Sequence, residues 1–129
     1  MNPDDESTET PMRFLMTYQQ DPNVPPPTPE KMAAIGAYTQ KNVQAGIVVM
    51  TGGLVRPSHG TQVKSERGKF SVTDGPFAET KELIDGFAVI EVPSKAAAIA
   101  VAQEFMALAG DGTGEILQMF DPGGPPPGR

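Results

Sequence analysis

The chain contains no cysteine and only one histidine, His59. The absence of thiols excludes disulfides, thiolate nucleophiles and cysteine-ligated zinc or iron–sulfur centres. A single imidazole also excludes a metal site built from two or three histidines of one chain. We therefore expect no metal and no cofactor. The chemistry that remains is that of carboxylates, hydroxyls, lysine, arginine and one histidine.

Basic clusters and long apolar runs are also missing. The net charge is −6 and the pI is about 4.6, which argues against nucleic acid as a partner. Four of the 16 acidic residues lie in the first eleven positions, so 12 acidic residues face 10 basic ones from residue 12 onward. No stretch approaches the ~20 apolar residues of a membrane span, and the first residues do not resemble a signal peptide. We expect a cytoplasmic protein without a membrane partner.

The 129 residues are enough for one domain with its own core. Residues 1–11 are acidic and almost free of apolar groups, so we predict a disordered tail. Residues 121–129 form a proline- and glycine-rich run that cannot pack, which predicts a second flexible tail. The predicted domain therefore comprises residues 12–120.

Within this domain the pattern predicts four buried strands, two helices and one hairpin. Thr28 and Ser94 are predicted helix N-caps, and Gly46 and Gly110 are predicted stops. The predicted strands are 13–18, 47–54, 86–92 and 115–120, the helices 28–45 and 95–109, and the hairpin strands 61–66 and 69–73. This order matches the split β-α-β pattern of an α+β, ferredoxin-like fold with an inserted β-hairpin.

The helix periodicity predicts which side of each helix is buried. The predicted buried side chains are Met32, Ile35, Tyr38 and Val43 in the first helix, and Ala96, Ile99, Ala100, Phe105, Met106 and Leu108 in the second. Gly36 weakens the first helix by up to ~1 kcal/mol relative to alanine. We interpret it as a position of close packing on the sheet.

All four strands carry apolar residues on both faces, whereas a ferredoxin-like sheet has helices on one face only. The uncovered face would leave a large apolar patch in a monomer. Since two-fold dimers are the commonest soluble assemblies, we predict a homodimer that packs through its open sheet faces.

Residues 72–85, VTDGPFAETKELID, concentrate turn chemistry and functional groups. Asp74 can hydrogen-bond its own backbone, Gly75 tolerates positive φ, and Pro76 fixes φ. One interpretation is a structural corner between two strands. The other is that Asp74, Lys81 and Glu82 border a small-molecule pocket.

The string from Val72 to Glu82 resembles the DGPF group of YCII-related proteins, and the likeness extends from about Met12 to Phe120. The resemblance implies a ferredoxin-like fold that dimerises into an α/β barrel, in a family with no settled biochemical activity. Related proteins are suspected enzymes because a histidine and an aspartate meet in a pocket. Some DGPF proteins resemble companions of extracytoplasmic-function sigma factors.

Two functional hypotheses follow, and the sequence leaves both open. In an acid–base enzyme, Asp74 would be the base or an orienting carboxylate and His59 the proton carrier. Arg56 or Lys81 would clamp an anion. In a non-catalytic binding or regulatory module, the ligand would lie beside the motif. The predicted ligand-binding residues are Arg56, Phe77, Lys81, Glu82 and Tyr18.

Overall fold

The computed structural model describes residues 11–55, 60–75 and 84–120. Its elements follow the order β1 (Met12–Gln20), α1 (Pro29–Gln44), β2 (Val48–Gly53), β3 (Thr61–Glu66), β4 (Lys69–Asp74), β5 (Gly86–Val92), α2 (Lys95–Ala109) and β6 (Gly112–Met119).

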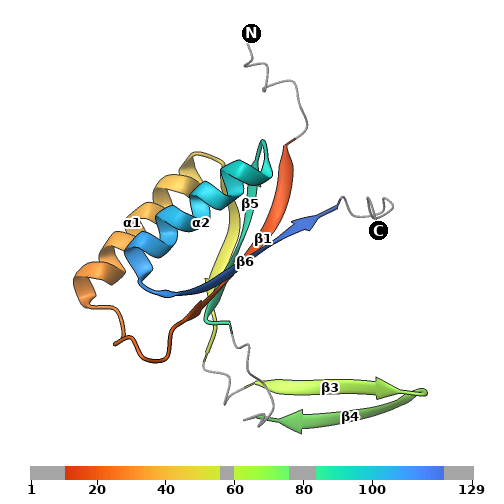
Figure 1. The fold of residues 1–129 in the computed structure, drawn as a ribbon. Helices are drawn as coiled ribbons and strands as arrows, with labels where there is room; N and C mark the ends of the chain where they lie inside the picture. Colours follow the sequence, from red (N-terminus) through yellow and green to blue (C-terminus); the bar gives the residue numbers. More distant parts are fainter. Residues whose placement is uncertain (1–10, 56–59, 76–83, 121–129) are drawn as a thin grey trace.

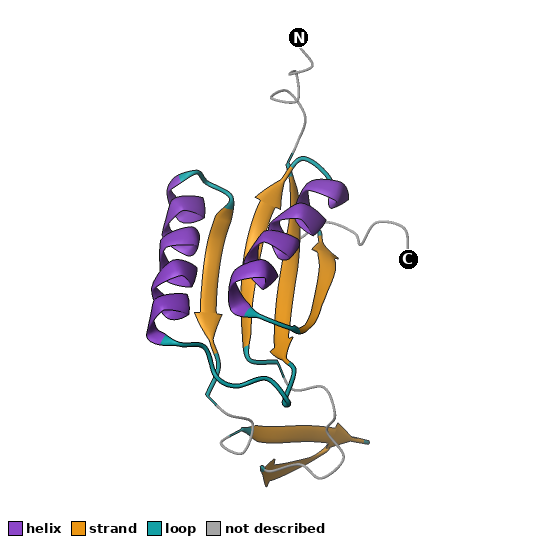
Figure 2. Cartoon of the chain, turned by 60° about the vertical axis from the view of Figure 1, so that its left-hand side comes forward, coloured by secondary structure: helices purple, strands orange, loops and turns teal. Residues whose placement is uncertain are grey.

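Four of the strands form one sheet in the order β2-β5-β1-β6, and every neighbouring pair is antiparallel. Helix α1 connects β1 to β2 with β5 between them, and α2 connects β5 to β6 with β1 between them. Two interleaved split β-α-β units of this kind define the ferredoxin-like arrangement. Both helices lie on the same face of the sheet (Figures 1 and 2). The predicted α+β class is therefore confirmed, and the arrangement is consistent with the predicted ferredoxin-like fold.

The helix ends lie where the capping residues predict them. Thr28 and Ser94 each accept a backbone N–H of the first turn through their side-chain oxygens. Gly46 and Gly110 follow the last turns with φ of 80° and 108°, a region that favours glycine. Of the two helices that the structure describes, neither is long and apolar enough to cross a membrane.

The buried core lies between the sheet and the helices. Ile90 in the central strand β5 is fully buried, and the other core side chains are Phe14, Met16, Val48, Val92 and Ala98. The predicted buried side of α2 is partly wrong, because Ala96, Ile99 and Ala100 are exposed. Residues 96–102 of this helix are all apolar, so the periodicity could not specify which side meets the sheet.

Strands β3 and β4 pair with each other in a separate two-stranded sheet. Every residue of both strands is exposed. Figure 1 shows the pair lying away from the four-stranded sheet, beyond the ends of β2 and β5. The apolar side chains Val63, Phe70 and Val72 of this pair form an uncovered surface. A two-stranded sheet alone is at best marginally stable in water.

Candidate functional site

A groove of about 610 Å³ lies between α1, α2 and the helix-covered face of the sheet. It exists because α1 makes its main contacts with α2 and β2, whereas α2 packs on β5, β1 and β6. The space beneath α1 is therefore only partly filled. The apolar lining comes from both helices and the sheet, and it includes Met16, Tyr18, Met32, Ile35, Tyr38, Val43, Val48, Phe87, Ala88, Ile90, Val101 and Phe105.

The apolar side of α1 faces this groove without being covered. Met32 and Val43, which the periodicity predicts to be buried, are 56% and 49% exposed. Gly36 also lines the groove, and a Cβ placed on it would meet no atom within 4 Å. The expectation that Gly36 permits close packing on the sheet is therefore wrong. The apolar side of α1 therefore borders open space at a position where a helix would ordinarily pack against the sheet.

Tyr18 of β1 forms the wall at one end of the groove. Its ring meets Phe105 edge-on, with the ring centroids 5.2 Å apart, and its hydroxyl donates to the carbonyl of Gly110 at 2.9 Å. Burial, followed by the charge of Asp85 and two further carboxylates, raises the pKa of Tyr18 above its usual value. Its phenol is therefore neutral, with its hydroxyl bonded to the α2–β6 connection.

Asp85 lies beside Tyr18 and also lines the groove. One of its carboxylate oxygens accepts the backbone N–H of Gln20 at 2.7 Å, and its own N–H donates to the Tyr18 carbonyl at 2.7 Å. The strands approach closely here, since a Cβ on Gly86 would lie 3.2 Å from the Gly52 carbonyl oxygen. This end of the groove is thus built from fixed backbone and one oriented carboxylate.

Tyr38 holds the two helices together across the groove. Its hydroxyl donates to a carboxylate oxygen of Glu104 at 2.7 Å and lies 3.3 Å from the Val101 carbonyl. Burial, and then the hydrogen bond to Glu104, raise the pKa of Tyr38 well above its usual range. The neutral phenol can therefore keep donating at any physiological pH, which fixes α1 relative to α2.

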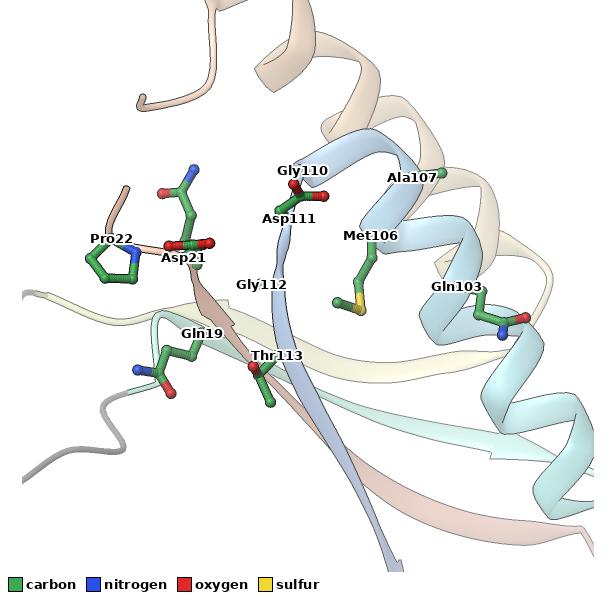
Figure 3. A pocket seen from close by; sticks show the side chains of 11 residues that line it. Gln19, Asp21, Pro22, Gln103, Met106, Ala107, Gly110, Asp111, Gly112 and Thr113 are labelled. Atoms are coloured by element: carbon green, nitrogen blue, oxygen red, sulfur yellow. The ribbon is translucent and has the colours of Figure 1, made fainter. Parts of the chain in front are cut away.

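A second hollow of about 700 Å³ lies at the α2–β6 connection (Figure 3). Its rim is polar and includes Asp21, Asp111 and Gln103. The backbone N–H of Asp21 donates to the Asp111 carbonyl at 3.1 Å, so the two loops are tied together.

Nowhere in residues 11–55, 60–75 and 84–120 do three His, Cys, Asp or Glu side chains gather as metal ligands would.

The sequence-predicted site is only partly within the described residues. Tyr18 lines the groove, whereas Asp74 is exposed at the end of β4 and accepts the Thr61 hydroxyl at 2.8 Å. The other predicted residues, Arg56, His59, Phe77, Lys81 and Glu82, lie outside the described residues. Their roles stay predictions. The groove was not predicted from the sequence, because Gly36 inside an apolar helix face is compatible with either close packing or a gap.

The fold and the groove define an α+β protein of ferredoxin-like architecture with an apolar hollow between its helices and its sheet. The sequence model of the YCII-related domain family matches residues 12–121. An uncharacterised protein of Rhizobium meliloti (strain 1021) is 32% identical over 96 residues, which cover 71% of this chain and 77% of the relative. The chain belongs to the YCII-related family.

Proposed function

We propose that this protein is a homodimer that binds a small molecule in the groove beneath α1. The observation that carries the proposal is the exposed apolar side of α1. Met32, Ile35 and Val43 line an open space of about 610 Å³, within the size range of small-molecule sites. A well-packed core leaves few voids larger than a water molecule, so an unfilled space of this size supports a binding role.

The homodimer is supported by the sheet face opposite the helices. The strand registers align Met50, Val89, Leu15 and Leu117 in one row across all four strands. Met50 and Leu117 are 56% and 51% exposed in the single chain. A second copy packed on this row would cover it and would form the α/β barrel that the DGPF resemblance implies.

Sedimentation velocity at micromolar concentration tests the dimer. The wild type is expected to sediment as a dimer, and Leu117→Lys is expected to weaken association at least about tenfold, because it would bury a charge without a partner. Ile99→Lys is the matched control, since Ile99 is an exposed aliphatic residue on α2. A monomeric wild type, or equal effects of the two variants, would refute the predicted interface.

A thermal-shift screen with a chemically diverse panel of small molecules tests the groove. Val43→Trp is expected to abolish stabilisation by the binding compounds, because the indole would occupy the groove. Val49→Trp is a closely matched control: both valines are 49% exposed, but Val49 lies at the β2 bulge and outside the groove lining. Compounds that stabilise the wild type and Val43→Trp equally would place binding elsewhere.

Acid–base catalysis and a regulatory partnership with an extracytoplasmic-function sigma factor remain alternatives to simple binding. The catalytic alternative requires Asp74, one carboxylate oxygen of which accepts the Thr61 hydroxyl and which does not line the groove. Binding in the groove is therefore the function that the described residues support best.

A further inference from the structure

We infer that the groove beneath α1 takes an uncharged, mainly apolar molecule, and that Gly36 keeps the groove open for it. The inference rests on the proposed function, because it names the chemical class of ligand for the same site. Three observations carry it: the charge of the lining, the volume of the groove, and the conformational cost of Gly36.

The lining that the structure describes carries a single charged side chain, Asp85, and no lysine, arginine or histidine. An anionic group entering the groove would lose its water shell without gaining a cationic partner among these described residues, which is strongly unfavourable. Apart from the two tyrosines, the remaining polar lining residues are neutral threonines and a glutamine (Thr17, Thr39, Gln40 and Thr51).

The volume limits the size of the ligand. A groove of about 610 Å³ lies within the range of about 300–1,000 Å³ that small-molecule sites span, so it suits a ligand of ordinary small-molecule size. A molecule with one or two rings fits this range. A fatty-acyl chain with its carboxylate is disfavoured by the charge of the lining rather than by its size.

Gly36 lowers the stability of α1, and the packing around it does not explain why a glycine stands there. A glycine inside a helix destabilises it by comparison with alanine, and the missing Cβ here relieves no contact, because nothing lies within 4 Å. Gly36 lines the groove, whereas the neighbouring Ala37 is exposed outside it. A side chain at position 36 would therefore project into the space that we assign to the ligand.

A pair of related fluorescent probes tests the ligand class on the full-length chain. N-phenyl-1-naphthylamine is uncharged, and 1-anilinonaphthalene-8-sulfonate carries the same rings with an added sulfonate. Fluorescence titration is expected to show saturable binding of the uncharged probe, with one site per chain, at least about tenfold tighter than binding of the sulfonate. Gly36→Leu should weaken binding of the uncharged probe at least about tenfold. Ala37→Leu should change it less than about twofold.

The outcomes separate this inference from the proposed function. If both probes bind equally and Gly36→Leu removes both, the groove is a binding site but the uncharged class is wrong. If the uncharged probe binds wild type and Gly36→Leu alike, the assignment of Gly36 and the site is wrong. If neither probe shows saturable binding, the ligand class is refuted, and the thermal-shift screen with Val43→Trp still decides whether the groove binds another class.

Discussion

Replacing Gly36 by alanine adds one methyl group to α1 at a position where the structure offers open space. A Cβ there would meet no atom within 4 Å, so the substitution introduces no clash. Alanine favours the helix over glycine by up to ~1 kcal/mol, partly by restricting the unfolded chain. We expect Gly36→Ala to raise the free energy of unfolding by about 0.5–1 kcal/mol.

Urea denaturation followed by circular dichroism measures this change. With a urea dependence of about 1–3 kcal/mol/M for a domain of this size, the midpoint should rise by roughly 0.2–1 M. Protein concentrations must match, because dimerisation would make the midpoint depend on concentration. Gly46→Ala is the control: its added Cβ also meets open space, but φ is +80°, so a loss of about 1–2 kcal/mol is expected. A destabilised Gly36→Ala would show that α1 packs closely there and that the groove is closed.

Three further predictions concern tyrosine ionisation, the open sheet face and the DGPF motif. Tyr18 and Tyr38, the only tyrosines, should show less tyrosinate absorbance near pH 10 in the folded chain than in the unfolded chain. Burial raises the pKa of both tyrosines. The contribution of the two tyrosines to stability is therefore complete below the unfolded pKa of about 10 and is lost as the pH rises towards the folded pKa values. Normal titration of both tyrosines in the native state would contradict this prediction. Arg13→Ala removes the ion-pair partner of Glu91 on the open sheet face. Sedimentation should show dimer association weakened at least about tenfold, because the interface would bury an unpaired carboxylate. Unchanged association would show that the ion pair lies in solvent, outside the interface. Asp74→Asn should change the urea-derived stability by less than ~1 kcal/mol if Asp74 serves a ligand, and a larger loss would assign it to the turn.

The positions of α1, β5 and α2 could be predicted from the sequence because local chemistry determines them. Thr28 and Ser94 supply side-chain oxygens to free N–H groups, and Gly110 tolerates the positive φ that ends α2. Strand β6 begins earlier than predicted, at Gly112. Gly112 and Gly114 are typical of a turn in sequence, yet they pair with Gln20 and Tyr18 of β1. Cross-strand pairing is a long-range property that local propensity does not contain.

The groove could not be predicted, because periodicity reports which side of a helix is apolar but not whether another element covers it. Met32 and Val43 belong to the apolar side of α1, and they are exposed because α1 packs mainly on β2 and α2. Of the predicted site residues, Tyr18 lines the groove, but its predicted role was in a pocket beside the motif and stays a prediction. The motif around Asp74 predicts a turn that extends into residues 76–83, which lie outside the described residues, and its functional role also stays a prediction.

The most direct test of binding beneath α1 uses the methionines that the chain already contains. Met16 and Met32 line the groove, whereas Met50 and Met119 lie on the open sheet face. With ¹³C-methyl-labelled methionine, titration of the protein with N-phenyl-1-naphthylamine should shift the Met16 and Met32 signals and leave Met50 and Met119 unchanged. Shifts confined to Met50 and Met119 would place the ligand on the open face and contradict the account.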